Sequence, residues 1–315
     1  MKSQASAPGK IILFGEHFVV YGVRAILCAI DKRVTVSAEK ISENMISIKS
    51  SIGNLKESPQ KKLKEIDNQL RPVYYLADKM IQKYKEKSGI EIKIESEIPS
   101  GVGLGSSSAC CVASAAAISG LFTRNSKEEI LQMAIEAEKT IFPNTSGADT
   151  TVCTYGGLMQ YDKKKGYSKI SCRNNFDLII ANSKIRHSTQ KVVSNVEKFK
   201  KKNEKKFSSI CNDVNKLIDD ALIHIKNNDL EGIGKNLTKN QEYLESIGVS
   251  NEKLREMIEV SKKFSFGSKL TGAGDGGCIF SIIDKSNLEK TMRQLERENY
   301  ECFSVKIDFT GLDTF

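Results

Sequence analysis

The sequence reads Gly101-Val102-Gly103-Leu104-Gly105-Ser106-Ser107-Ser108-Ala109 between an alternating polar and apolar run and a run of small apolar residues. The alternating run, residues 90–98, has a period of two and predicts a strand with one buried face. The small-residue run, residues 107–121, predicts a helix. The three glycines between them allow a tight turn whose backbone can approach a ligand closely. Amide groups at the start of a helix favour an anion, so this stretch is a candidate phosphate-binding loop.

The loop matches neither of two common nucleotide-binding patterns. No G-x-x-x-x-G-K-[ST] occurs in the chain, which excludes a Walker A loop. Ser106 follows Gly105 where the dinucleotide fingerprint G-x-G-x-x-G needs another spacing. A glycine- and serine-rich stretch taken alone is more often an ordinary turn, so the interpretation depends on further motifs.

Two more glycine-rich segments lie near the two ends of the chain. The first combines Pro8-Gly9-Lys10, Gly15-Glu16-His17 and Tyr21-Gly22 around a predicted strand at residues 9–14, and so brings together a lysine, an acid and a histidine. The second runs from Lys269 to Cys278 and has four glycines between positions 272 and 277. A buried strand is predicted directly after it, which favours a loop that contacts a ligand over a flexible linker.

Glu138 and Asp149 are the acids that phosphoryl transfer would need. Glu138 lies at the end of a predicted helix that opens at Ser126 with a capping box, since Glu129 follows three positions later. Asp149 lies in residues 144–149, which predict a polar loop. Such carboxylates can hold a metal ion or accept a hydroxyl proton. The plainer alternatives are a solvated side chain for Glu138 and a cap for Asp149.

The order of the predicted elements indicates an α+β fold rather than regular βαβ alternation. A helical pattern over residues 60–85 is interrupted by Pro72, which ends or kinks a helix. We place a domain boundary near residue 180, which gives domains of residues 1–180 and 181–315. The other predicted elements are strands at 33–38, 45–48, 176–181, 278–283 and 303–309, four helical segments over 189–264, and a helix at 288–298.

Composition excludes several classes of protein. Charged residues make up 28% and hydrophobic residues 39% of the 315 positions, as in an ordinary soluble globular protein. The first residues lack a signal-peptide pattern, and the longest mostly apolar run, 109–122, is too short to cross a bilayer. We therefore expect a cytoplasmic protein. Of its eight cysteines, Cys110 and Cys111 are adjacent and the rest are scattered; no C-x-x-C pair occurs, which argues for buried thiols and against a zinc site.

The formal net charge of +9 is concentrated in lysine runs such as 163–165 and 200–202. A nucleic-acid-binding protein can carry such a charge, but no nucleic-acid-binding motif accompanies it. We expect a surface biased towards small anionic substrates, with neither a nucleic-acid nor a membrane partner.

Taken together, the three glycine-rich segments and the two acids resemble the superfamily of galactokinase, homoserine kinase, mevalonate kinase and phosphomevalonate kinase, the GHMP kinases. The motifs occur in the superfamily's order and span nearly the whole chain. Residues 7–22 are similar to the first motif of the mevalonate kinases, whereas galactokinases have an arginine-valine-asparagine strand there. Residues 146–157, residues 184–189 and the eleven-position spacing of Glu138 from Asp149 also resemble mevalonate kinases.

The resemblance implies a two-lobed GHMP-kinase-like fold, with an N-terminal α/β domain of the ribosomal-protein-S5-like type and a helix-rich C-terminal α+β domain. It implies transfer of the ATP γ-phosphate to the 5-hydroxyl of mevalonate in isoprenoid biosynthesis, with Mg²⁺ as cofactor. Other acceptors stay open: phosphomevalonate, the 3-position of mevalonate, a sugar or homoserine. A non-catalytic ligand sensor also stays open, although such proteins usually lose the lysine or one of the acids.

The resemblance also implies roles for individual residues. Asp149 and Lys10 are expected to be catalytic, and Ser107 and Glu138 are expected to hold the magnesium ion. The residues expected to contact ATP are Gly101, Gly103, Leu104, Gly105, Ser106, Ser107, Ser108, Gly272 and Gly274. The residues expected to hold the acceptor are Glu16, His17, Thr189 and Arg186.

One departure from the family pattern is Asp275, at a position where the family usually has glycine. A negative charge near a triphosphate repels it, and the repulsion is weaker where the side chain faces solvent or a cation. The sequence leaves open which residues contact adenine and whether isoprenoid diphosphates inhibit. It also leaves open the oligomeric state, for which a homodimer is one option.

Overall fold

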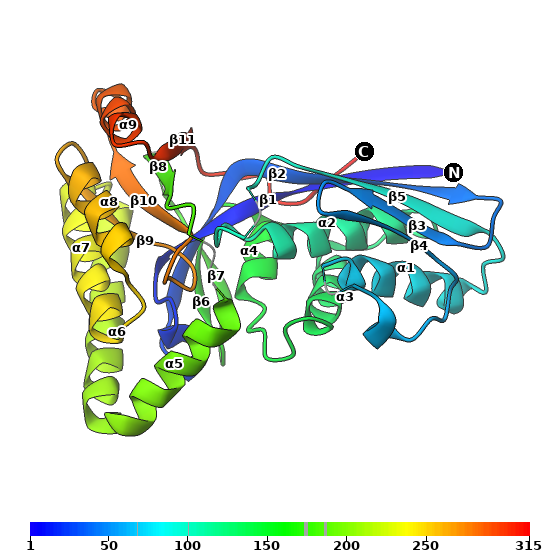
Figure 1. The fold of residues 1–315 in the computed structure, drawn as a ribbon, viewed down its shortest axis with the longest axis horizontal. Coiled ribbons are helices and arrows are strands. Elements are labelled where there is room, and N and C mark those ends of the chain that lie inside the picture. The colour runs from blue at the N-terminus through cyan, green and yellow to red at the C-terminus, as the bar shows by residue number, and fades with distance from the viewer. Residues whose placement is uncertain (68, 100, 173–175, 186–187) are drawn as a thin grey trace.

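The computed structural model describes residues 1–67, 69–99, 101–172, 176–185 and 188–315. It has two lobes, each built on its own β-sheet (Figure 1). The fold is α+β, as the sequence predicts. The apolar core is continuous from one lobe to the other. Among the described residues, no helix has the length and apolar composition needed to cross a membrane.

The first lobe is built on a sheet with the strand order β12-β1-β2-β5-β3-β4, and the hairpin β6-β7 pairs with β2. Only β3 and β5 pair in parallel among these described strands. The predicted alternation is confirmed in β5, where Ile90 and Ile92 are fully buried. The strands are β1 (Lys2–Phe14), β2 (Ala25–Ile41), β3 (Ile46–Ser50), β4 (Gly53–Glu57), β5 (Gly89–Ser96), β6 (Leu158–Asp162), β7 (Gly166–Ile170) and β12 (Asp313–Thr314).

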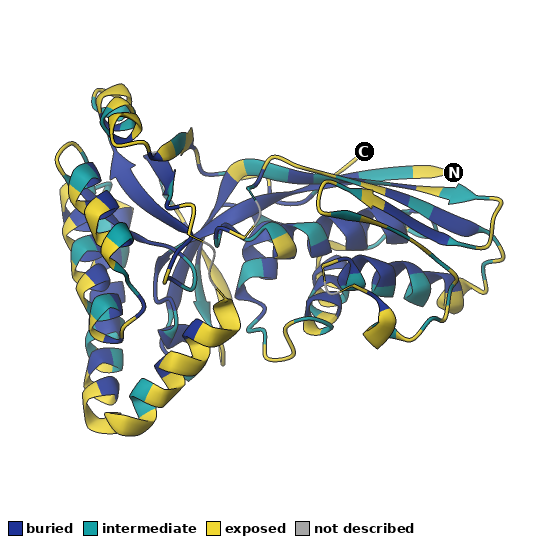
Figure 2. Ribbon diagram, in the orientation of Figure 1, coloured by how far each residue is buried: buried dark blue, intermediate teal, exposed yellow. Residues whose placement is uncertain are grey.

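Helices cover one face of this sheet (Figure 1). The central helix, α2, is buried along most of its length because its small side chains let neighbouring elements approach (Figure 2). Pro72 stands at the start of α1, where its missing amide proton costs nothing, so the helical pattern over 60–85 begins only there. The helices are α1 (Arg71–Tyr84), α2 (Ser106–Gly120), α3 (Lys127–Lys139) and α4 (Ala148–Tyr155), with short 3₁₀ turns η1 (Phe18–Tyr21) and η2 (Leu63–Glu65).

The second lobe is built on an antiparallel sheet with the order β11-β8-β10-β9. The four helical segments predicted over 189–264 are confirmed as α5 to α8. The elements are β8 (Asp177–Asn182), α5 (Thr189–Lys202), α6 (Glu204–Asn227), α7 (Leu230–Ser246), α8 (Glu252–Lys262), β9 (Gly267–Leu270), β10 (Cys278–Ile283), α9 (Leu288–Arg297) and β11 (Glu301–Val305).

The chain passes from one lobe to the other twice. Residue 180, the predicted domain boundary, falls inside β8, whose partners β10 and β11 both belong to the second sheet. The division at that residue stays a prediction, but the second sheet already begins at Asp177. After β11 the chain returns to the first lobe, where β12 pairs with β1. The strand predicted over 303–309 is therefore too long, since β11 ends at Val305.

Candidate active site

Lys10, on β1, connects the phosphate-loop candidate with one of the acids. Its side chain is only 4% exposed, and Nζ lies 3.0 Å from Oδ2 of Asp149. The same ammonium group donates to the carbonyl of Gly103 at 3.2 Å. The backbone amide of Lys10 donates to the carbonyl of Leu104 at 2.9 Å. A Cβ atom at Gly105 would lie 2.6 Å from Cγ of Lys10, so only glycine leaves room for this lysine.

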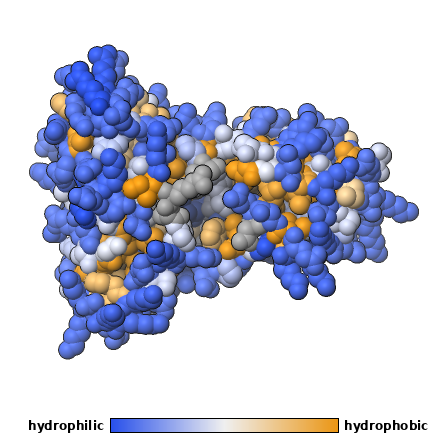
Figure 3. Space-filling view, in the orientation of Figure 1, coloured by the Kyte–Doolittle hydropathy of each residue, from blue (hydrophilic) through white to orange (hydrophobic). Residues whose placement is uncertain are grey.

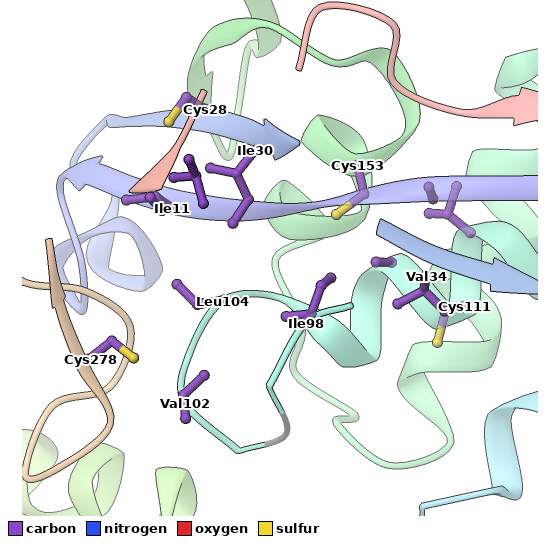
Figure 4. Close-up of a cluster of buried hydrophobic side chains, with 14 of the residues drawn as sticks. Ile11, Cys28, Ile30, Val34, Ile98, Val102, Leu104, Cys111, Cys153 and Cys278 are labelled. Carbon is purple, nitrogen blue, oxygen red and sulfur yellow. The ribbon is translucent and has the colours of Figure 1, made fainter. Parts of the chain in front are cut away.

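The phosphate-loop candidate alternates anchoring side chains with glycines. Val102 and Leu104 are buried in the apolar core, near Ile11 and Ile98 (Figure 4). Gly103 between them has a φ of 85°, in the left-handed region that favours glycine. Among the described residues, no side chain caps the N-terminus of α2. Uncapped amides at the positive end of a helix dipole make this turn suited to an anion.

Glu138 lies at the end of α3, and its carboxylate is hydrogen-bonded to residues at or just before the starts of two other helices. Its carboxylate is 3% exposed and accepts hydrogen bonds from the hydroxyls of Ser108 in α2 and Thr145, just before α4. The capping box predicted for this helix, Ser126 with Glu129, is confirmed. Burial raises the pKa of the Glu138 carboxyl, against the effect of the two hydroxyl hydrogen bonds. A buried acid of this kind gains from a nearby cation.

The serine that contacts Glu138 is Ser108, whereas Ser107 is exposed in the first turn of α2. No hydrogen bond between Ser107 and Glu138 occurs in the part of the chain that the structure describes, so their pairing around a metal ion stays a prediction. No sequence pattern distinguishes Thr145 from its neighbours in the polar stretch that contains Asp149. No group of three His, Cys, Asp or Glu side chains placed to hold a metal occurs among the described residues.

Asp149 lies in the first turn of α4, so the prediction of a loop at this position was wrong. The helix begins after Gly147, whose φ is 79°, and the hydroxyl oxygen of Ser146 accepts from the amide of Ala148 at 3.3 Å in its first turn. The Asp149 side chain is 35% exposed, which leaves it open to a solute while it pairs with Lys10. The turn before α2 and the first turn of α4 therefore meet at one lysine, which contacts Gly103 and Asp149. On the face shown in Figure 3, the surface is hollowed at the waist between the two lobes.

The third glycine-rich segment comes from the second lobe and packs against this site. Gly272 faces the phosphate-loop candidate, because a Cβ atom built on it would lie 3.1 Å from Cα of Gly103. The hydroxyl oxygen of Thr271 accepts from the amide of Ile12 at 3.2 Å. Gly274 is held by packing, since a Cβ there would lie 2.1 Å from the carbonyl oxygen of Val249. The structure thus brings the three glycine-rich segments together.

Comparisons with known proteins agree with this arrangement. Residues 71–157 match the GHMP kinases N terminal domain, and residues 221–302 match the GHMP kinases C terminal domain. A mevalonate kinase of Methanocaldococcus jannaschii is 34% identical over 95% of this chain and 98% of its own length. A mevalonate kinase of Archaeoglobus fulgidus is 35% identical over 89% of this chain and 92% of its own. This chain belongs to the mevalonate kinase family of the GHMP kinases.

Solved structures show the same fold as this mevalonate kinase family member. The crystal structure of the Methanococcus jannaschii mevalonate kinase covers 97% of the chain with a TM-score of 0.83 and 29% identity. A structure of L. major mevalonate kinase in complex with R-mevalonate covers 97% with a TM-score of 0.82; its 23% identity supports the fold alone.

The residues expected to hold the acceptor are not all equally accessible in this family member. His17 is half-buried, and its Nε2 lies 2.7 Å from the carbonyl oxygen of Ala273. Burial lowers the pKa of His17, so the neutral ring donates this hydrogen bond. Thr189 is exposed at the first position of α5. Arg186 lies outside the described residues.

Glu16 has no exposed surface and forms an ion pair with Lys269, so a substrate cannot reach it in this structure. The expectation that Glu16 contacts the acceptor is therefore corrected to an internal role. Lys269 opens the third glycine-rich segment, but its sequence context alone indicates no role for it. Nothing in the sequence links it to Glu16, which lies 253 positions earlier.

Asp275, which departs from the family pattern, is exposed. It has a φ of 56°, and its amide donates to the carbonyl of Val249 at 2.7 Å. No ion pair or hydrogen bond of its carboxylate occurs among the described residues. The sequence leaves open whether this carboxylate faces solvent or a cation, and in the structure it faces solvent.

Proposed function

We propose that this chain transfers the γ-phosphoryl group of ATP to the 5-hydroxyl of mevalonate and releases 5-phosphomevalonate and ADP. The observation that carries the proposal is the ion pair of Lys10 and Asp149 beside the uncapped start of α2. The relatives are named mevalonate kinases, and one solved relative was crystallised with R-mevalonate.

The triphosphate of ATP would lie along residues 103–108, where helix amides and glycines offer donors without steric obstruction. Ser106 and Ser107 add hydroxyl donors at the open end of α2. Gly272 and Gly274 would cover the same phosphates from the second lobe, because their turn already contacts the backbone of Gly103.

The residues around Glu138 fit a magnesium ion. Mg²⁺ prefers oxygen ligands and usually binds one or two carboxylates together with substrate phosphates. Glu138 is a buried carboxylate whose pKa is raised by burial, so a cation would offset its desolvation. Ser107 is the candidate second ligand, since its hydroxyl is exposed at the phosphate end of α2. When bound, the ion would neutralise phosphate charge and favour attack on the γ-phosphorus.

Asp149 and Lys10 would then act on the acceptor hydroxyl. Asp149 is the base, because its carboxylate is partly exposed and lies at the start of a helix, where it can accept the proton. Lys10 compensates the negative charge that develops on the transferring group. Its position is fixed by the carbonyl of Gly103, so this cation does not need to reorganise during the reaction.

The acceptor would lie between Asp149 and α5, where Thr189 offers an exposed hydroxyl. Arg186, in the segment that precedes α5, is the candidate partner for the mevalonate carboxylate. His17 would not contact the acceptor directly; it would position the turn that contains Ala273, through its hydrogen bond to that residue.

A panel of acceptors tests this proposal. ADP release would be measured with ATP and, in turn, mevalonate, phosphomevalonate, galactose and homoserine. We expect turnover with mevalonate to exceed that with each of the others by at least 100-fold in kcat/KM. Phosphorus NMR of the product distinguishes the 5-phosphate from the 3-phosphate. A preference for another alcohol, or a 3-phosphate product, would refute the assignment.

A further inference from the structure

The two lobes are connected by an ion pair that solvent does not reach. Lys269, on β9 of the second lobe, donates from Nζ to Oε1 of Glu16, which follows β1 of the first lobe. Both side chains have 0% exposed surface. The same ammonium group donates to the carbonyl of Leu270 at 2.8 Å. The second carboxylate oxygen of Glu16, Oε2, has no hydrogen-bond partner within the described part of the chain.

This ion pair is the most buried of three contacts between the same two segments. The amide of Ile12 donates to Thr271, and His17 donates to the carbonyl of Ala273. One segment, residues 10–17, carries Lys10 of the candidate active site. The other, residues 269–274, carries Gly272, which touches the phosphate-loop candidate. The contacts therefore connect the catalytic lysine's strand to the turn that would cover the phosphates.

A buried ion pair contributes little net stability, because removing both charges from water costs about as much free energy as their attraction returns. Moving two charges out of water is offset only when the geometry is good, and apolar residues of similar size are often as stable or more so. Burial raises the pKa of Glu16 and lowers that of Lys269, which reflects this desolvation. Unlike apolar packing, however, a buried ion pair fixes the direction and the distance between two groups.

We propose that Glu16 and Lys269 form a positioning pair, which holds the turn at residues 271–274 in register with Lys10 and the phosphate-loop candidate. Neither residue touches the substrates. The pair acts through Thr271 and Gly272 on one side and through the strand of Lys10 on the other. The inference rests on the proposed phosphoryl transfer from ATP, and it predicts that breaking the pair lowers activity even in molecules that are fully folded.

The test uses Glu16→Gln, Lys269→Met and the double variant, assayed with ATP and mevalonate well below each variant's unfolding midpoint. Each single change should lower kcat/KM for ATP at least tenfold. Because both remove the same contact, the double variant should lose no more than a single one. The double variant leaves no unpaired buried charge, so its unfolding midpoint should recover towards that of the wild type while its activity does not.

Two further variants keep the test decisive. Glu16→Asp retains the charge but shortens the side chain by one methylene, so it should fold and still lose at least tenfold in kcat/KM. Ser281→Ala is the matched control: it removes buried hydrogen bonds to Ser261 and Ser268 within the second lobe. It should lower the unfolding midpoint and leave kcat/KM within twofold of the wild type.

Three results would overturn the positioning role. They are activity within twofold of the wild type in the folded single variants, recovery of activity in the double variant, and losses that multiply as for independent residues. A wild-type protein without turnover on ATP and mevalonate would instead refute the proposed function, so the two failures are distinguishable.

Discussion

At the residue scale, the ammonium group of Lys10 contacts groups from two other elements. It donates to the carbonyl of Gly103 in the phosphate-loop candidate and pairs with the carboxylate of Asp149 at the start of α4. A lysine side chain normally has much rotamer freedom, and these contacts remove it before any ligand binds. Phosphoryl transfer depends mainly on positioning and electrostatics, so a lysine fixed in advance suits that chemistry.

Replacing either member of this pair should abolish most of the turnover while nucleotide binding persists. We expect Asp149→Asn and Lys10→Met each to lower kcat by roughly 10²-fold or more, the scale of a lost acid–base or charge-stabilising group. Dissociation constants for ATP, measured by calorimetry, should stay within about threefold if the amides of α2 provide most of the binding.

Asp162→Asn is the control for that comparison, because this acid ends β6 and its Oδ1 accepts from the backbone amides of Lys164 and Lys165. It should retain full activity. Near-wild-type kcat in Asp149→Asn or Lys10→Met would remove that residue from the reaction.

Glu138→Gln should raise stability and lower magnesium-dependent activity. Burial raises the pKa of Glu138 above its ordinary value of 4.5, so the folded state binds this proton more tightly than the unfolded state does. The carboxyl then favours folding below pH 4.5, and that contribution is lost as pH rises through the folded-state pKa. Gln cannot ionise, so its advantage in unfolding midpoint should be small near pH 4.5 and grow towards neutrality.

Thermal unfolding at several pH values, with and without Mg²⁺ and a nucleotide, measures both effects of that change. Magnesium with the nucleotide should stabilise the wild type more than the Gln variant. An unchanged magnesium requirement for turnover would exclude Glu138 as a ligand, and an equal midpoint difference at all pH values would contradict the role of its ionisation.

Asp275→Gly should improve nucleotide affinity. Two charges about 10 Å apart in a water-like medium repel by roughly 0.4 kcal/mol, so removing one near several phosphate charges should lower the KM for ATP about two- to fivefold. The gain should shrink as salt is added, since the side chain is exposed. Asp275→Asn is the matched control, because it removes the charge and keeps a side chain that tolerates a positive φ. A KM that is the same in all three proteins would contradict the electrostatic explanation.

At the element scale, α3 has a stabilising capping box at one end and a candidate functional residue at the other. Its first turn has the capping box of Ser126 and Glu129, and its last turn has Glu138. Ser126→Ala should destabilise the protein by about 1 kcal/mol through the lost cap. In a chain of this size, that corresponds to a fall of roughly 2 °C in the unfolding midpoint.

Activity is the second readout for Ser126→Ala. Because the cap lies at the opposite end of α3 from Glu138, kcat and the magnesium requirement should match those of the wild type. A tenfold loss of kcat would mean that the cap affects the geometry of the site.

The elements that the sequence predicts well are those whose signals are local. The capping box at Ser126, the alternation of β5 and the apolar spacing of α6 are examples, because each pattern lies within one element. The prediction failed for α4, since its β-branched threonines and valine favour a helix only weakly and tertiary burial outweighs that preference. The site is predicted only in part, because the contact of Lys269 with Glu16 depends on how the two lobes meet.

At the scale of the whole molecule, the candidate active site lies where the lobes meet. The first lobe contributes Lys10, Asp149 and the start of α2, and the second contributes the turn at 271–274. The continuous apolar core and the return of the chain end to β1 fix the lobes relative to each other. Such a site needs both lobes, so neither lobe alone should have activity.

The most direct test of the account is a crystal structure of the protein with a non-hydrolysable ATP analogue and mevalonate. The β- and γ-phosphates should lie at the first turn of α2, between residues 103–108 and Gly272. The 5-hydroxyl of mevalonate should lie within hydrogen-bonding distance of Asp149, with Lys10 beside it. Phosphates bound elsewhere, or an acceptor hydroxyl that faces away from Asp149, would contradict it.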